Sequence, residues 1–173
     1  MPDADAFPDA PVEIRVARDA DGEAIGWLTA RCWADYAGCY YDRHGELGDL
    51  DRIATHYGDK GGCAFAATRG ARLVGSIAVA PTVGREWELT KLYVDPRLRR
   101  IGLARRLLTE AEEFAVARGG QRMILWTDTR FEGAHRFYER QGYVADGRTR
   151  ALHDLSNSVE YFYARALASA AGG

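Results

Sequence analysis

The sequence predicts an α/β fold, layered in the α+β manner, in which a mixed, mostly antiparallel central sheet carries helices on both faces. Segments of alternating apolar and polar residues are interspersed with segments of helical spacing, in the expected order β, α, α, β, β, β, α, β, α, β, β. Three of these strands follow one another directly, as hairpins do, whereas a doubly wound sheet would alternate strictly. The 173 residues, 47% of them hydrophobic, suffice for one core.

We therefore expect a single domain over residues 12–167. Residues 1–11 are rich in Asp, Ala and Pro and have almost no apolar pattern, which is typical of a disordered tail. Residues 168–173 are expected to form a second, flexible tail.

The first part of the domain predicts one strand and two helices. Residues 12–16 alternate between apolar and polar side chains, as a half-buried strand does. Asp19 is expected to cap a helix that starts at Ala20, has amphipathic spacing and ends before Gly38. A second short helix is expected over residues 47–57.

The middle of the chain predicts three consecutive strands. Residues 63–68 and 72–80 have strand character and flank a tight turn at residues 69–70, so they form a β-hairpin. A third strand over residues 87–94 ends at the Asp-Pro pair at 95–96.

The last part predicts two helices and three strands. A long helix follows an arginine-rich loop, and the glycine pair at 119–120 is suited to end it. The elements expected after it are a strand at 123–126, a short helix at 131–138 closed by Gly142, and strands near 143–145 and 158–164.

Composition excludes several classes of function. The net charge of −2 argues against a nucleic-acid-binding surface, which usually carries a basic excess. No stretch reaches the roughly 18 apolar residues of a membrane span, and the acidic N-terminus is unlike a signal peptide, so we expect a soluble, cytoplasmic protein without membrane contact. The three cysteines contain no CxxC pair, so we expect neither a disulfide framework nor a metal site.

The arginines cluster at one place, immediately before the long helix. Five of them lie within ten residues of an otherwise balanced chain, namely Arg97, Arg99, Arg100, Arg105 and Arg106. The first amides of a helix have no internal partner and carry partial positive charge, so this turn is suited to bind a compact anion such as a diphosphate. Gly102 and Ala104 leave room for the approach of phosphate oxygens. Neither a P-loop nor a dinucleotide-binding glycine motif is present, which disfavours ATP and NAD.

Two motifs in order resemble the GNAT superfamily of N-acetyltransferases. Residues 99–104 (RRIGLA) match the central signature Q/R-x-x-G-x-G/A, and residues 92–96 (LYVDP) are similar to the strand and stop that precede it. Residues 134–143 (AHRFYERQGY) are similar to the second motif, A-x-x-F-Y-x-x-x-G-F/Y. The resemblance covers residues 62–145 and extends from Val12 to the final strand, which leaves only the extreme termini outside it. It implies a GNAT-like acyl-CoA N-acyltransferase fold with acetyl-CoA as co-substrate and no metal.

By this resemblance, the backbone of the third strand would pair with the pantetheine arm of acetyl-CoA, and amides at the helix start would hold the diphosphate. The cofactor-binding residues implied are Leu92, Tyr93, Val94, Arg99, Arg100, Ile101, Gly102, Leu103, Ala104, Arg105 and Tyr138. The alternative for each arginine is an ordinary solvated surface charge.

The resemblance also implies direct attack of an amine on the thioester, without a covalent enzyme intermediate. A general base must then remove a proton from the ammonium. Glu88 is the first candidate and Glu86, one side-chain repeat away, is the second; either one is equally compatible with a solvent-facing strand position. Tyr138 matches the tyrosine that protonates the departing thiolate, although a core role at helical spacing is the alternative.

One position departs from the family pattern. Phe131 stands where the second motif usually begins with Asn, so a polar contact to the cofactor is lost. Asp128 or Thr129, just upstream, could replace it, and Asp128 is equally suited to cap the helix.

Aromatic residues and carboxylates gather between the first two helices, where relatives often build the acceptor site. The region contains Tyr36, Tyr40, Tyr41, Asp42, His44, Glu46 and Asp49. Tyr40, Tyr41 and Asp42, together with Glu86, are the first candidates for binding a cationic amine. An exposed polar loop has the same composition. His153 with Asp154, near the last strands, could also border the acceptor pocket.

The function expected is an N-acetyltransferase that transfers the acetyl group of acetyl-CoA to a primary amine of a small molecule or protein, by direct attack in a ternary complex. The alternatives are a non-catalytic acyl-CoA-binding sensor and, against the net charge, an oligonucleotide binder. The oligomeric state stays open, a homodimer included.

Overall fold

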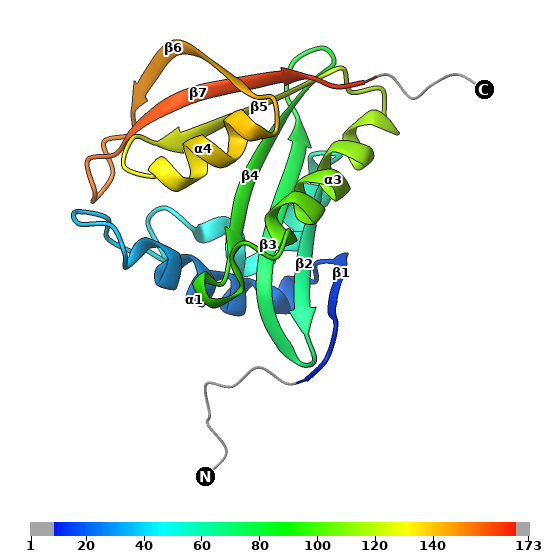
Figure 1. The fold of residues 1–173 in the computed structure, drawn as a ribbon, viewed down its shortest axis with the longest axis vertical. Coiled ribbons are helices and arrows are strands. Elements are labelled where there is room, and N and C mark those ends of the chain that lie inside the picture. The colour runs from blue at the N-terminus through cyan, green and yellow to red at the C-terminus, as the bar shows by residue number, and fades with distance from the viewer. Residues whose placement is uncertain (1–8, 169–173) are drawn as a thin grey trace.

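The computed structural model describes residues 9–168, and these form one seven-stranded sheet with helices on both faces (Figure 1). The strand order is β1-β2-β3-β4-β5-β7-β6. The strands are β1 (Val12–Val16), β2 (Cys63–Arg69), β3 (Arg72–Pro81), β4 (Glu86–Val94), β5 (Arg122–Asp128), β6 (Val144–Ala151) and β7 (Val159–Ala166). The α-helices are α1 (Gly22–Trp33), α2 (Ile53–Asp59), α3 (Leu103–Val116) and α4 (Glu132–Arg140), with short 3₁₀ turns η1 (Asp19–Asp21), η2 (Gly48–Arg52) and η3 (Pro96–Leu98).

The expected fold class is confirmed. Among the described residues, β4 and β5 are parallel and every other pair of neighbouring strands is antiparallel. The β2–β3 hairpin turns at residues 70–71, where Gly70 has a φ of 59°, a left-handed conformation that glycine adopts without strain.

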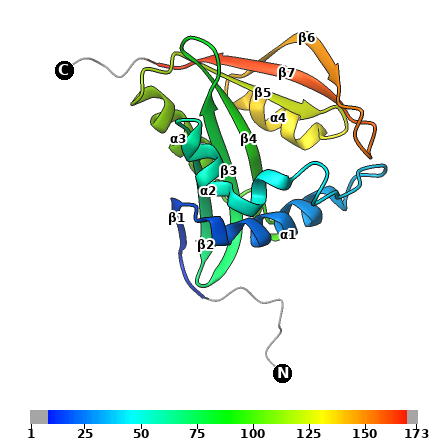
Figure 2. The same cartoon turned by 180° about the vertical axis from the view of Figure 1, so that it is seen from behind.

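Two apolar cores lie on opposite faces of the sheet, so both faces are covered. On one face, α3 and α4 bury a set that includes Leu107, Ala111 and Tyr138 against the sheet. On the other face, α1 and α2 cover β2 and β3 with Ile25, Ile53 and their neighbours (Figure 2). The apolar residues of α3 recur about every four positions, and residues four apart lie above one another on a helix. They therefore form one apolar face, which packs against the sheet.

The expectation for Asp19 was wrong. Its carboxylate does not cap α1, which begins only at Gly22 after the turn η1. Instead Oδ1 accepts a hydrogen bond from the amide of Thr55 at 2.9 Å, and Oδ2 accepts one from the Thr55 hydroxyl at 2.6 Å. Asp19 therefore satisfies an orphan amide near the start of α2, a helix 36 residues further along the chain.

Most of the two expected tails lies outside the described residues, at 1–8 and 169–173. Residues 9–11 of the first tail are described and have no regular structure. The Ala10 carbonyl accepts a hydrogen bond from Arg69 Nε at 2.9 Å, so the chain is tied to β2 before β1 begins.

A buried carboxylate fixes the end of β4. Asp95 has no exposed surface, and its carboxylate accepts hydrogen bonds from Arg31 of α1 at 2.6 Å and from Arg97. The bond from Arg31 joins helix α1 to the loop that precedes α3. This connection holds in place the two elements that border the site described below.

Gly22 is required by close packing, and replacing it with alanine should lower the free energy of unfolding by about 1–3 kcal/mol. A Cβ at this position would overlap the Leu50 carbonyl oxygen, which is backbone and cannot rotate away. Chemical denaturation measures the change. Gly58→Ala is the matched control, since it lies in α2 with open space around it and should leave stability unchanged or raise it by up to about 1 kcal/mol. Equal effects of the two substitutions would contradict this account of Gly22.

Candidate active site

Strands β4 and β5 pair only at their beginnings and then separate (Figure 1). The parallel pairing joins Glu86–Glu88 to Arg122–Ile124 and goes no further. Beyond it, residues 89–94 of β4 have a strand partner only on the β3 side. A bulge lies in this stretch: Lys91 has a φ of 57°, and its carbonyl accepts a hydrogen bond from the Ser76 hydroxyl at 2.8 Å. The open side of β4 thus offers unpaired backbone groups to an extended ligand.

A groove of about 670 Å³ runs from this opening to the N-terminus of α3, and we call it the α3 groove. Its walls come from α1, β4, the loop before α3, and α4. Ile101, by contrast, does not line it and is 58% exposed. The predicted cofactor-binding residues that line the α3 groove are Leu92, Tyr93, Val94, Arg99, Arg100, Gly102, Leu103, Ala104, Arg105 and Tyr138.

The end of the α3 groove is built to receive an anion. Arg100 and Gly102 both have left-handed backbone conformations, with φ of 66° and 80°, and no side chain caps the helix that follows. Turns of this kind aim successive backbone N–H groups at one point. The first intrahelical bond is made by Arg106 to the Gly102 carbonyl, at 3.0 Å, so the amides before it have no partner within the helix. This geometry fits a diphosphate.

Three of the five clustered arginines have partners within the protein. Arg99 forms a surface ion pair with Asp35, at 3.8 Å. Arg97 binds the buried Asp95 carboxylate, and Arg106 donates to the Val12 carbonyl at 3.0 Å. The arginines that line the α3 groove are Arg99, Arg100 and Arg105.

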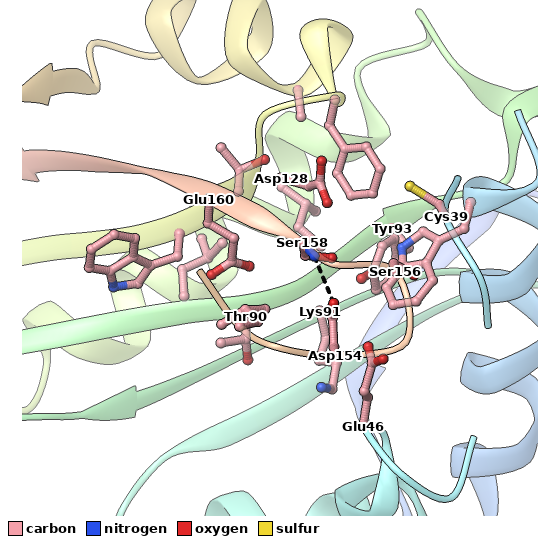
Figure 3. A pocket seen from close by; sticks show the side chains of 18 of the residues that line it. Cys39, Glu46, Thr90, Lys91, Tyr93, Asp128, Asp154, Ser156, Ser158 and Glu160 are labelled. Atoms are coloured by element: carbon pink, nitrogen blue, oxygen red, sulfur yellow. Dashed lines mark hydrogen bonds between the residues drawn. The ribbon is translucent and has the colours of Figure 1, made fainter. Parts of the chain in front are cut away.

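A second cavity, of about 430 Å³, lies beside β4, and we call it the Glu88 cavity (Figure 3). Its walls come from β4, the ends of β5 and α1, the loop before η2, and the loop between β6 and β7. The α3 groove and the Glu88 cavity share six lining residues, so they meet. These are Trp33, Leu92, Tyr93, Phe131, Ala134 and Tyr138.

Tyr138 stands where the two spaces meet. Its ring packs against Phe137, Tyr143 and Tyr163, and only 6% of the residue is exposed. No hydrogen bond within residues 9–168 uses its hydroxyl group. Burial raises the pKa of Tyr138, so the hydroxyl is protonated at neutral pH and is free to donate.

The two candidate bases differ in their surroundings. Glu88 lines the Glu88 cavity; burial raises its pKa, the Arg150 charge opposes this, and the Glu160 charge adds to it. Glu86 does not line the cavity. Its carboxylate binds Arg122 at 2.8 Å and accepts a hydrogen bond from a threonine hydroxyl, so it is occupied as an ion pair. The geometry therefore favours Glu88 as the carboxylate that meets a substrate.

The predicted acceptor residues Tyr40, Tyr41 and Asp42 do not line the Glu88 cavity. Tyr40 is 57% exposed, the Tyr41 ring packs edge-on against Trp33, and Asp42 accepts a hydrogen bond from the amide of Gly45. The expected loop does border the cavity, but through other residues. Glu46 of this loop and Asp154 of the β6–β7 loop, both named from the sequence as possible parts of an acceptor site, do line the cavity. The lining residues that sequence reasoning missed are Cys39, Ser156 and Ser158.

Phe131 borders both spaces in place of the usual polar residue. Its ring lies 4.7 Å from that of Tyr36, centroid to centroid, and so makes an apolar wall. Asp128 does not cap α4, because its carboxylate binds Arg130 at 2.7 Å. It lines the Glu88 cavity as half of that ion pair.

None of the helices within 9–168 is both long and apolar enough to cross a membrane. That part of the chain also contains no cluster of three His, Cys, Asp or Glu side chains placed to hold a metal ion.

The sequence and the fold were then compared with known proteins. The sequence model of the acetyltransferase (GNAT) family matches residues 29–143. An uncharacterized N-acetyltransferase of Escherichia coli (strain K12), YjgM, is 30% identical over 141 residues, which cover 79% of this chain and 83% of that protein.

Solved structures have the same fold. A GNAT-family acetyltransferase from Staphylococcus aureus Mu50 matches with a TM-score of 0.79 at 20% identity, over 91% of this chain and all of that one. YncA, a putative acetyltransferase from Salmonella typhimurium whose structure contains its cofactor acetyl-CoA, matches with a TM-score of 0.71 at 18% identity, over 93% and 96% of the two chains. The family match, which spans more than half the chain, identifies this protein as an acyltransferase that belongs to the acetyltransferase (GNAT) family.

Proposed function

We propose that this protein transfers the acetyl group of acetyl-CoA to a primary amine by direct attack within a ternary complex. The observation that carries the proposal is the meeting of the α3 groove and the Glu88 cavity at Tyr138. A groove that fits an acyl-CoA and a cavity that fits an acceptor share this boundary. A reaction between two bound substrates requires such a meeting point.

In this proposal acetyl-CoA lies in the α3 groove. The free amides at residues 103–105 hold its diphosphate, and the open backbone of Leu92, Tyr93 and Val94 pairs with its pantetheine arm. When bound, acetyl-CoA supplies a thioester carbonyl that an amine can attack. The neighbouring arginines Arg99, Arg100 and Arg105 add positive charge around the phosphates.

Two side chains move the protons. An ammonium acceptor loses two protons when it becomes an amide. Glu88 takes the first, directly or through water, and passes it to solvent. Tyr138 gives its own proton to the sulfur as the C–S bond breaks. The second proton leaves the nitrogen as the N–C bond forms and is returned, directly or through water, to the Tyr138 oxygen, which restores the tyrosine. The net result is one amide, one thiol and one released proton.

Release of free thiol from acetyl-CoA in the presence of a panel of primary amines tests the proposal. The expected result is amine-dependent release together with the acetylated amine, detected by mass spectrometry. The contrary result is binding of acetyl-CoA without amine-dependent thiol release from any panel member. That outcome would support the non-catalytic acyl-CoA sensor instead.

Gly102→Ala should weaken CoA binding by about tenfold or more, because a side chain there strains the turn that aims the amides at the diphosphate. Calorimetric titration with CoA measures the dissociation constant. Gly119→Ala is a matched control: Gly119 has a φ of 82° against 80° for Gly102, and no atom lies within 4 Å of either added Cβ. Gly119 stands at the other end of α3, so its substitution should cost similar stability and leave CoA affinity unchanged. If the two variants bound CoA with equal affinity, the diphosphate of CoA would not lie at Gly102.

A further inference from the structure

The Glu88 cavity is lined by more carboxylates than its ion pairs neutralise. Asp128 is neutralised by Arg130 at 2.7 Å, and Glu160 by Arg150 at 2.6 Å. The carboxylates that line the cavity are Glu46, Glu88, Asp128, Asp154 and Glu160. Three of them, Glu46, Glu88 and Asp154, form no ion pair with any of residues 9–168.

Lys91, which also lines the cavity, does not neutralise the remaining carboxylates. Its ammonium group binds Asp49 at 3.1 Å, and both side chains are 15% exposed. Unpaired negative charges on the walls of one cavity disfavour its empty state, and Glu46 and Asp154 repel each other directly. Such a conflict between local charge and stability is expected where a cationic ligand is to be bound.

Glu46 carries the clearest sign of a missing partner. Its Oε1 atom is buried and makes no hydrogen bond, which costs free energy unless a ligand supplies a donor. Burial raises the pKa of Glu46, and the nearby charges of Asp154 and Asp42 add to the increase, while the Leu155 amide opposes it. Figure 3 shows Glu46 rising from the loop after α1 toward Asp154, which comes from the β6–β7 loop.

The acidic groups occupy two separate positions. Glu88 lies within β4, where its backbone is paired with Ala80 of β3 and Ile124 of β5, whereas Glu46 lies on the loop after α1. Glu46 faces Asp154, whose negative charge repels that of Glu46 and so raises the pKa of Glu46. Within the described residues, Asp154 Oδ1 accepts a hydrogen bond from the Ser158 amide at 2.7 Å. The cavity therefore has one acidic position on β4 and a second between its two loops.

We propose that the acceptor carries two cationic nitrogen groups, as an aliphatic diamine does: Glu88 faces the amine that reacts, and Glu46 with Asp154 binds the second cation. This inference rests on the proposed N-acetyltransferase activity and names its substrate class. An ammonium group has three donors and no acceptor, which suits the free oxygen of Glu46 and the carboxylate of Asp154. An acceptor with one amine leaves this second position unpaired.

Competing acceptors of equal length test the proposal. Putrescine has two ammonium groups, n-butylamine has the same carbon chain with one, and γ-aminobutyrate replaces the second ammonium with a carboxylate. We expect kcat/KM to be at least about tenfold higher for putrescine than for n-butylamine, and lowest for γ-aminobutyrate. A longer diamine, cadaverine, extends the comparison to a greater spacing between the two charges.

Glu46→Gln and Asp154→Asn should each lower kcat/KM for putrescine by about tenfold or more and leave n-butylamine within about threefold of the unsubstituted protein. Glu110→Gln, an exposed carboxamide substitution on α3, is the control and should change neither. Calorimetric titration of putrescine into the CoA-saturated protein gives a readout without turnover. The same two substitutions should weaken that binding.

The outcomes separate this inference from the proposed function. Acetylation of n-butylamine and putrescine with equal kcat/KM, or equal losses for both in Glu46→Gln, overturns the diamine inference and leaves the acetyltransferase activity standing. Absence of acetylation of every amine, with CoA still bound, overturns both.

Discussion

Replacing Tyr138 with phenylalanine should lower kcat by about 10²- to 10⁴-fold, the range typical for loss of a positioned proton donor. The substitution removes one oxygen atom and keeps the ring that packs against Phe137, Tyr143 and Tyr163. Because no hydrogen bond within the described residues uses the hydroxyl, the free energy of unfolding should hardly change. The KM for the acceptor should change little too, since the hydroxyl acts on the departing sulfur. Steady-state thiol release measures kcat and KM, and chemical denaturation measures the free energy of unfolding.

Tyr143→Phe is the matched control for this prediction. Tyr143 lies in the same core, but its hydroxyl donates to Glu112 at 2.7 Å and it lines neither the α3 groove nor the Glu88 cavity. Its loss should reduce stability by about 1–3 kcal/mol, as for a hydrogen bond to a charged group, and leave kcat unchanged. The two tyrosines thus separate catalysis from stability. If Tyr138→Phe retained kcat within about threefold, the tyrosine would be a core residue alone, and protonation of the thiolate would fall to water.

The parts of the site that sequence analysis located are those encoded in contiguous residues. The turn at 99–104 and the start of α3 form one local structure, so the residues that build the anion-binding end of the α3 groove are neighbours in the chain. Tyr138 was found in the same way, from the helical spacing and motif around it. For such elements the physics is short-range: left-handed glycine, small side chains and free amides all act within one turn.

The acceptor side was located only in outline, because its residues come from distant segments. Glu46, Glu88 and Asp154 meet only after the sheet has formed, and nothing in their local sequence distinguishes Glu46 from Asp42 four residues earlier. In the folded protein Asp42 accepts a hydrogen bond from the Gly45 amide within a local turn, and Glu46 lines the cavity. Likewise, Asp19 has the sequence features of a cap for α1, yet tertiary contact directs it to Thr55. Polar side chains with several possible partners are where local rules fail.

The second large effect is expected at Glu88. Glu88→Gln should lower kcat/KM by about 10²- to 10⁴-fold because glutamine cannot take a proton from the ammonium. The pKa of Glu88 is raised, chiefly by burial, so its acid-limb inflection in kcat/KM should lie above the usual glutamate range. Activity is lost as pH falls through that pKa, since only the deprotonated carboxylate acts as a base. Full pH profiles of both proteins measure the effect.

Glu88→Gln should remove this inflection and leave the one that reports the amine's own pKa. Glu86→Gln is the control: it breaks the pair with Arg122 at the protein surface and should keep the inflection.

The stability of Glu88→Gln shows whether a loss of activity comes from lost proton transfer or from a damaged fold. Since the native state disfavours a charged Glu88, the folded pKa lies above the unfolded value, and at neutral pH the substitution should not lower the free energy of unfolding. If Glu88→Gln is folded and binds CoA but has lost this inflection, Glu88 is the base. If the variant keeps the inflection, the base is water or another carboxylate of the cavity. The burial that destabilises the charged form also brings the pKa closer to the working pH, where a base is most effective.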